Sequence, residues 1–79
     1  MAVPIPQTLD QADAAGGKPF RGSDEEEAAY GAPIQLWPRA GASSGDICAA
    51  FICLDGWRLV RYRDGGLGCT ETYLVPCTD

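Results

Sequence analysis

The pattern of apolar and polar residues divides this chain into two unlike parts, and the C-terminal part carries the stronger signal. Residues 47–54 form a continuous apolar run of strand length, and Asp55-Gly56 then supplies the residue types that a two-residue type I′ turn prefers. Residues 57–63 are typical of a returning strand, and residues 67–75 of a third strand after a Gly-rich turn. We therefore expect a small β fold, a three-stranded antiparallel meander, in a module spanning residues 46–79.

Residues 1–45 carry large apolar side chains only singly, among Ala, Gly, Pro and Ser. Such a composition buries too little apolar surface to offset the loss of chain entropy. We therefore expect an extended, partly disordered interaction arm that orders on the surface of a partner. The apolar residues expected to anchor it there are Ile5, Leu9, Phe20, Tyr30, Ile34, Leu36 and Trp37.

Two local elements are predicted within this arm. Ser23 and Glu26 have the spacing of a capping box, so we expect one short helix over about residues 24–30 that ends at Gly31. Residues 33–38 alternate apolar and polar side chains between two prolines, which predicts a short edge strand or an extended anchor. The acidic run at the helix start is expected to be a solvated helix end, with a docking patch for a basic partner or a metal as the alternative.

The four cysteines lie in the last third of the chain, and the chain contains no histidine. Four such cysteines form two disulfides or a four-thiolate zinc site, or they remain free structural thiols. The spacings lack the tight Cys knuckles of zinc modules, so we expect disulfides involving Cys48, Cys53, Cys69 and Cys77, and no bound metal.

The Asp55-Gly56 turn predicts a register that limits how these cysteines pair. It places Leu54 opposite Trp57, Cys53 opposite Arg58 and Phe51 opposite Val60. Five residues of strand separate Cys48 from Cys53 by roughly 17 Å, too far for a disulfide. Position along the strands favours Cys48–Cys69 with Cys53–Cys77. Because the outer strands of a meander lie about 9.5 Å apart, at least one bridge must sit at a sheet end or at a bulge.

The charge of the chain bears on its partners. A formal net charge of −5 with only six Lys and Arg residues argues against nucleic acid, whose phosphates are bound by basic patches. Arg58, Arg61 and Arg63 do cluster, but acidic residues lie nearby, so we expect a solvated strand face with cross-strand ion pairs. Neither a membrane helix nor a signal peptide is visible in the sequence.

The residues needed for enzymatic chemistry are scarce. A chain without histidine has no Cys-His or Ser-His nucleophile, and its Gly-rich segment lies between strands instead of opening a helix. Trp57 and Tyr62 are expected to pack in the core, with an aromatic ligand face as the alternative. We therefore expect no enzyme, no cofactor and no small-molecule substrate.

One segment has a partial likeness to a known family. Residues 56–69, GWRLVRYRDGGLGC, resemble the Trp-Arg-Tyr hairpin of the small two-disulfide microbial alpha-amylase inhibitors. In that family the three residues are contiguous, whereas Leu59, Val60 and Arg61 separate Arg58 from Tyr62 here. The resemblance supplies an alternative function and no family assignment.

These observations lead to three hypotheses. The first is a non-enzymatic structural protein, a small subunit that contacts other protein subunits in an assembly. We expect a minor capsid, tail or decoration protein of a phage-like virion, because disulfides and the lack of a visible leader suit a particle that leaves its cell. The second is a secreted, disulfide-rich inhibitor or toxin-like module, and the third is a small four-cysteine zinc module. The expected location is a virion or the extracellular space.

Overall fold

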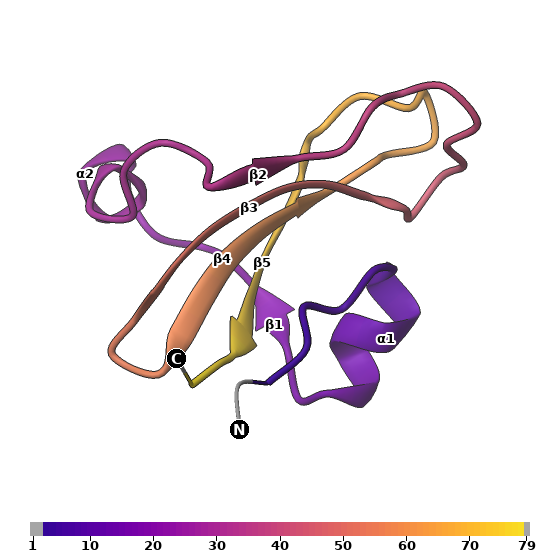
Figure 1. Cartoon of the computed structure of the whole chain (residues 1–79). Helices are drawn as coiled ribbons and strands as arrows, with labels where there is room; N and C mark the ends of the chain where they lie inside the picture. Colours follow the sequence, from indigo (N-terminus) through magenta and orange to yellow (C-terminus); the bar gives the residue numbers. More distant parts are fainter. Residues whose placement is uncertain (1–2, 79) are drawn as a thin grey trace.

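The computed structural model describes residues 3–78 and shows one antiparallel sheet with two short helices (Figure 1). The elements in chain order are α1 (Leu9–Ala14), β1 (Lys18–Pro19), α2 (Asp24–Ala28), β2 (Gln35–Leu36), β3 (Ile47–Leu54), β4 (Trp57–Tyr62) and β5 (Glu71–Pro76). The strand order is β1-β5-β4-β3-β2, with every neighbouring pair antiparallel. The predicted small β class is confirmed. The predicted number of three strands is wrong, because the arm adds the two edge strands β1 and β2.

The β3–β4 hairpin has the predicted turn and most of the predicted register. Asp55 and Gly56 both adopt positive φ, 54° and 84°, as a type I′ turn requires. Leu54 lies opposite Trp57 and Cys53 opposite Arg58, as expected. The next expected pair is wrong, since Ala50 instead of Phe51 lies opposite Val60.

Two register shifts in β3 explain this difference. One lies between Ile47 and Ala49 and the other between Ala50 and Cys53, and each adds one residue to β3 relative to β4. A bulge of this kind bends the strand and redirects side chains. The Arg58 guanidinium holds the second bulge by donating to the carbonyl oxygen of Phe51 at 2.6 Å. A continuous apolar run carries no periodic signal from which to locate a bulge.

The two disulfides are Cys48–Cys69 and Cys53–Cys77, the pairs favoured from the sequence, each with a Cα–Cα distance of 5.9 Å. Each bridge joins the outer strands around one end of the middle strand β4. Cys77 lies just beyond β5, where its N–H donates to the carbonyl of Gly56 in the turn. Cys69 lies in the loop before β5, at the opposite end of the meander. Each bridge therefore lies at an end of the sheet and next to a bulge in β3, the two positions at which the strand spacing allows a disulfide between outer strands.

The third strand begins later than expected, at Glu71 instead of residue 67. The intervening residues form a closed loop, in which the N–H of Asp64 donates to Gly68 and that of Leu67 to Asp64. Leu67 adopts a positive φ of 66°, which lies outside the β region of regular strands. Turn geometry therefore replaces strand pairing over this segment.

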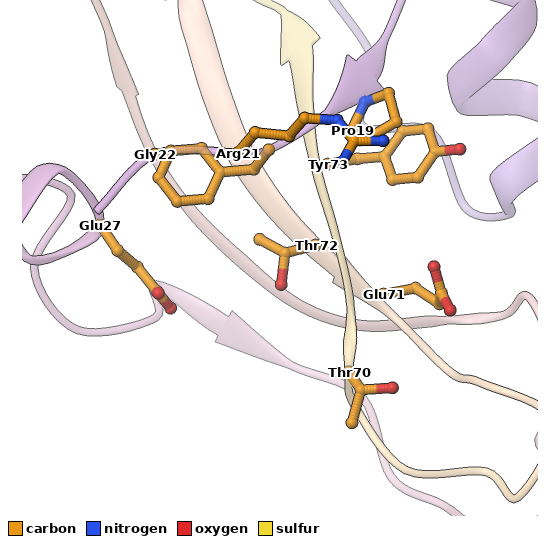
Figure 2. Close-up of a pocket in the computed structure, with 9 residues that line it drawn as sticks. Pro19, Arg21, Gly22, Glu27, Thr70, Glu71, Thr72 and Tyr73 are labelled. Carbon is orange, nitrogen blue, oxygen red and sulfur yellow. The ribbon is translucent and has the colours of Figure 1, made fainter. Parts of the chain in front are cut away.

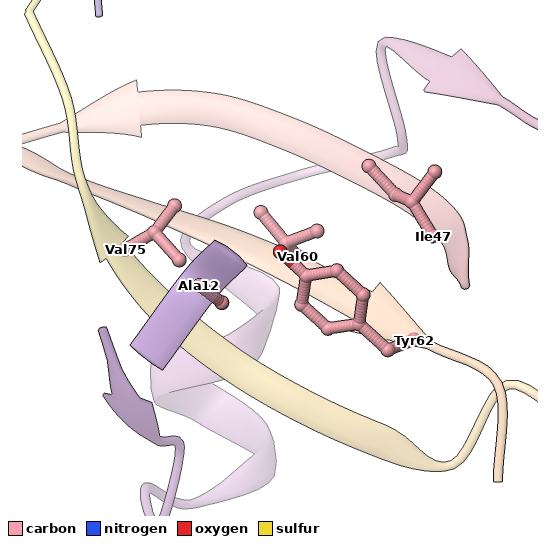
Figure 3. Close-up of a cluster of buried hydrophobic side chains, with 5 residues drawn as sticks. All are labelled: Ala12, Ile47, Val60, Tyr62 and Val75. Atoms are coloured by element: carbon pink, nitrogen blue, oxygen red, sulfur yellow. The ribbon is translucent and has the colours of Figure 1, made fainter. Parts of the chain in front are cut away.

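The arm covers both faces of the sheet that the meander builds. Leu59 and Val60 are consecutive in β4 and point to opposite faces, yet both are fully buried. On one face Ala12, Ile47, Val60, Tyr62 and Val75 form a cluster under α1, with Ile5, Leu9, Trp37 and Tyr73 against it (Figure 3). On the other face Ala49, Phe51 and Leu59 are covered by Phe20, Tyr30 and Leu74. The surface that the arm was expected to need is thus supplied by its own chain.

The arm contains two helices, so the expectation of one short helix is wrong in number. The capping box at Ser23 and Glu26 is present, and α2 ends before Gly31, whose φ is 73°. The helix that was missed, α1, begins after Thr8, whose hydroxyl accepts from the N–H of Gln11. Thr8 and Gln11 have the same Ser/Thr-x-x-Glu/Gln spacing, so a capping signal for α1 was available.

Candidate interaction surface

The structure divides the seven predicted anchor residues into two groups. Ile5, Leu9 and Trp37 pack on the α1 face of the sheet, and Phe20 and Tyr30 pack on the opposite face. The side chains of Ile34 and Leu36 instead face solvent, with 57% and 71% of their surface exposed. The anchors that remain available to a partner are therefore these two. We call the pair the β2 surface.

The β2 surface is exposed because β2 is both short and at the sheet edge. Leu36 lies opposite Ala49, so alternation places Leu36 and Ile34 on the Phe51 face, while Trp37 turns to the other face. The N–H of Ile34 donates to Ala50 and that of Trp37 to Cys48, which fixes this orientation. The expected edge strand is confirmed, whereas Trp37 is part of the chain's own core instead of a separate anchor.

A further exposed apolar side chain was not singled out from the sequence. Ile52 is 39% exposed and lies in the second bulge of β3. Its neighbours in the run, Phe51 and Ala50, are both buried. Ile52 differs from these two residues in being exposed, and it lies in the bulge. An unbroken apolar run in the sequence does not show where a bulge occurs.

A hollow of about 410 Å³ lies next to the start of β2. Phe51 forms part of its lining, with Ala28 and Gly31 from the end of α2 and Pro33 from the segment that leads into β2. Asp24, Glu27 and Arg61 supply its charged groups. We call this feature the α2 hollow. Pro33 directly precedes Ile34 in the segment that joins α2 to β2 (Figure 1), so the hollow and the β2 surface are neighbours.

The charges around the α2 hollow are mostly negative. Four acidic residues and no basic residue lie between Ser23 and Pro38. The guanidinium of Arg61 forms an ion pair with Glu27 and lies 5.6 Å from the centre of the Phe51 ring. Burial raises the pKa of Tyr30 on the same face, and the carboxylates of Asp55 and Glu26 add to that rise. This side of the molecule therefore combines exposed apolar side chains with a negative rim.

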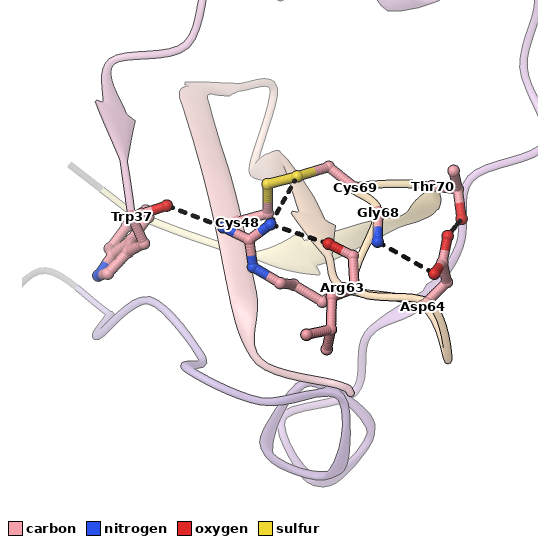
Figure 4. The surroundings of a disulfide bond; sticks show 8 residues. Trp37, Cys48, Arg63, Asp64, Gly68, Cys69 and Thr70 are labelled. Carbon is pink, nitrogen blue, oxygen red and sulfur yellow. Dashed lines mark hydrogen bonds between the residues drawn. A yellow bond between two sulfur atoms is a disulfide. The ribbon is translucent and has the colours of Figure 1, made fainter. Parts of the chain in front are cut away.

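The arginine cluster has a different role from the one expected. Arg58 and Arg63 are each only 5% exposed, so a solvated strand face is wrong for these two residues. Arg63 donates to the carbonyls of Trp37 and Leu67 and contacts Cys69 Sγ at 3.5 Å (Figure 4). A planar guanidinium can satisfy several carbonyls at once, which a buried loop and bulge require. Arg61 does form an ion pair of the expected kind, with Glu27.

The loop before β5 is organised by one carboxylate. Asp64 accepts from the N–H groups of Gly66 and Gly68 and from the hydroxyl of Thr70 (Figure 4). The Thr70 hydrogen bond, followed by the two backbone ones, lowers the pKa of Asp64 below its ordinary value of 3.8. Because Cys69 lies between Gly68 and Thr70, these bonds also position the first disulfide.

A second hollow, of about 480 Å³, lies at the opposite edge of the sheet, where β1 stops and β5 continues (Figure 2). Its lining includes Arg21, Glu27, Thr70 and Glu71 together with the aromatic ring of Tyr73. Opposite charges are mixed here, and the Thr70 hydroxyl already donates to Asp64 within the loop before β5. We assign it no chemistry.

The thiols and acidic groups of residues 3–78 do not form a metal centre. All four cysteines are bonded in disulfides, so the zinc hypothesis has no thiolate ligands. Across the described residues, no group of three or more Cys, Asp or Glu side chains is arranged to hold a metal ion. Tyr62 is fully buried and donates to the carbonyl of Pro6 at 2.9 Å, which places it in the core and not on a ligand face.

Comparisons with known proteins give no information on the β2 surface, so its function is inferred from its geometry. The chain matches no protein-family model, no curated protein and no solved structure. Neither α1 nor α2, the helices within residues 3–78, has the length and apolar character needed to cross a bilayer.

Proposed function

We propose that this protein is a non-catalytic interaction protein that docks on another protein through the β2 surface. The observation that carries the proposal is the exposure of Ile34 and Leu36 on an edge strand, while the other predicted anchors are packed inside the chain. Burying one such side chain contributes about 1.5–3 kcal/mol, so the pair can supply the centre of an interface.

The short β2 strand favours recognition by side chains over the addition of a long strand. Only Gln35 and Leu36 belong to β2, and Pro33 and Pro38 flank this segment. Proline lacks the N–H that a growing sheet needs and commonly protects sheet edges. A partner is therefore expected to cover Ile34 and Leu36 instead of extending the sheet.

We propose a subunit of a larger assembly as the setting, specifically a minor capsid, tail or decoration protein of a phage-like virion. Two disulfides that enclose the ends of the meander suit a protein that works in an oxidising environment. The exposed Ile34 and Leu36 give such a subunit one defined surface through which it can bind a neighbouring subunit.

A secreted inhibitor or toxin-like module is the second candidate. The observation that favours it is the packing of the arm on both faces of its own sheet, which gives a self-contained, disulfide-stapled unit. In this case the β2 surface would dock on a soluble enzyme or receptor instead of a repeating subunit.

Site-specific photo-crosslinking in the cells or particles that contain the protein tests the proposal. A photoreactive residue replaces Leu36, and the matched control places it at Lys18 on the opposite edge strand. We expect one discrete protein adduct from position 36 that is absent from the control, and its loss when Ile34→Ser is added. A shell or tail subunit in the adduct supports the virion setting, and a soluble enzyme supports the second candidate. No adduct at position 36, or equal adducts at both positions, would contradict the docking surface.

A further inference from the structure

We infer that the partner segment recognised by the β2 surface is basic and carries a large apolar side chain, with the apolar side chain on Ile34 and Leu36 and a Lys or Arg toward the α2 hollow. This inference rests on the proposed function and adds the chemistry of the partner.

The apolar half of the recognition follows from the exposed side chains. Ile34 and Leu36 lie on the same face as Phe51, and Pro33 connects them to the hollow that Phe51 lines. A partner side chain placed there gains contact with two exposed aliphatic groups without displacing a side chain of the core.

The charged half follows from the residues around this apolar strip. Asp24 and Glu27 line the α2 hollow, and Glu25 and Glu26 lie beside them on α2. Arg61 is the one basic group in the lining, and its guanidinium is already paired with Glu27. A cation entering the hollow therefore meets Asp24 with its neighbouring glutamates, whereas an acidic segment would be repelled.

The net charge of the chain agrees with this polarity. The net charge of −5 gives the whole molecule an attraction for basic partners and a repulsion for acidic ones. Arg39 follows β2 on its C-terminal side, away from α2 in sequence. Along the chain, acidic residues therefore precede the β2 surface and a basic residue follows it, which predicts one orientation of the bound segment.

Titration of the isotope-labelled full chain with four ten-residue peptides tests the inference, with binding followed by amide NMR shifts. The probes alternate Val with Lys, Val with Gln, Val with Glu, and Ser with Lys. We expect the Val–Lys peptide to shift the amides of Gly31, Ile34 and Leu36 and to bind at least about tenfold more tightly than the other three. A tenfold ratio corresponds to roughly 1.4 kcal/mol, within reach of one buried apolar side chain or several ion contacts.

Matched variants separate the apolar from the charged contribution. Leu36→Ser is expected to weaken Val–Lys binding about tenfold. Asp24→Asn is expected to weaken it roughly threefold, the size typical of an exposed ion contact. Asp10→Asn removes the same charge from the first turn of α1, on the other face of the sheet, and is expected to leave binding unchanged.

The outcomes distinguish this inference from the proposed function. Equal binding of the Val–Gln or Val–Glu peptide at the same amides overturns the basic preference and leaves the docking surface intact. Equal binding of the Ser–Lys peptide overturns the apolar requirement. Shifts confined to other parts of the sheet, or no shifts with any probe, overturn the inference, while the photo-crosslinking result at position 36 decides the proposed function separately.

Discussion

The stapled meander and the N-terminal arm are held in the native structure by different physical means. Both disulfides lie within the meander, and the β3–β4 and β4–β5 pairings run along nearly the whole length of β4. The arm has no disulfide cross-link to the sheet, and each of its strands pairs through only two residues. Cross-links and continuous pairing therefore define the meander, whereas side-chain packing and a few backbone hydrogen bonds position the arm.

The comparison shows that each part depends on the other. The meander is a single sheet with apolar side chains on both faces, and a sheet of this kind needs a cover on each side. The arm lacks a core of its own but supplies covers from α1 and from Phe20 and Tyr30. Disulfides restrict the unfolded chain but do not remove apolar surface from water. The cross-links therefore do not substitute for the arm.

Removal of the arm is expected to have the largest effect. A chain that begins at Asp46 retains both disulfides but exposes Leu59, Val60 and Val75, which are buried in the full chain. We expect this fragment to lose cooperative thermal unfolding and the dispersion of its amide NMR spectrum, because neither face of the sheet is covered. A fragment that unfolds cooperatively like the full chain would show that the meander is self-sufficient.

Removal of one cross-link is expected to be the next largest effect. Cys53→Ala with Cys77→Ala opens a link between residues 24 apart, and Cys48→Ala with Cys69→Ala opens one between residues 21 apart. Since the two loops are similar in length, we expect each pair to lower the free energy of unfolding by about 3 kcal/mol, measured by urea denaturation. A loss below about 1 kcal/mol in both pairs would mean that packing, and not cross-linking, stabilises the meander as well.

Removal of a single contact between the two parts is expected to have a smaller effect. Tyr62→Phe deletes the hydroxyl that donates to Pro6 and leaves a buried carbonyl without its partner. We expect a loss of about 1 kcal/mol in the free energy of unfolding and faster amide exchange in residues 7–14. Tyr73→Phe, on the ring that meets Tyr62 edge to face at 6.0 Å, is the control and should change exchange in that segment less. Equal effects of the two variants would argue against a specific tether.

Acidification is expected to produce the smallest effect, and one confined to the meander. The pKa of Asp64 is lowered in the folded chain, so its contribution to stability is present above its ordinary value of 3.8 and disappears as the pH falls through the lower folded value. We expect acid to loosen the loop at residues 64–70 before β1 or β2 responds, as followed by amide NMR shifts. Asp64→Asn should remove the part of this pH dependence that belongs to the loop, and an unchanged acid profile would contradict the assignment.

Local signals in the sequence were sufficient where neighbouring residues decide the structure. The turn at Asp55-Gly56, the capping box at Ser23 and the edge strand between Pro33 and Pro38 each depend on a few adjacent residues. Strand length and spacing, which are also geometric constants, excluded a Cys48–Cys53 bridge and favoured the observed pairs over the other remaining connectivity. The helix α1 belongs to the same group, because its capping residues Thr8 and Gln11 were readable.

Other features depend on contacts between distant parts of the chain. The bulges of β3 lie in an apolar run without periodicity, and the buried Arg58 and Arg63 have the same residue type as the more exposed Arg61. The strand β1 contains only Lys18 and Pro19, which carry no strand propensity of their own. These residues acquire their structure from the neighbour against which they lie.

The sequence by itself determined that this protein is a small, cross-linked antiparallel β unit, because turns, caps and disulfide spacing are local or geometric constraints. Tertiary structure alone decided which apolar residues of the arm remain outside. Seven of them looked alike as isolated anchors, and the two that stay exposed, Ile34 and Leu36, do so because β2 lies at the edge of the sheet beyond the reach of either cover. Burial depends on contacts between distant parts of the chain, so it cannot be predicted from any single segment of the sequence.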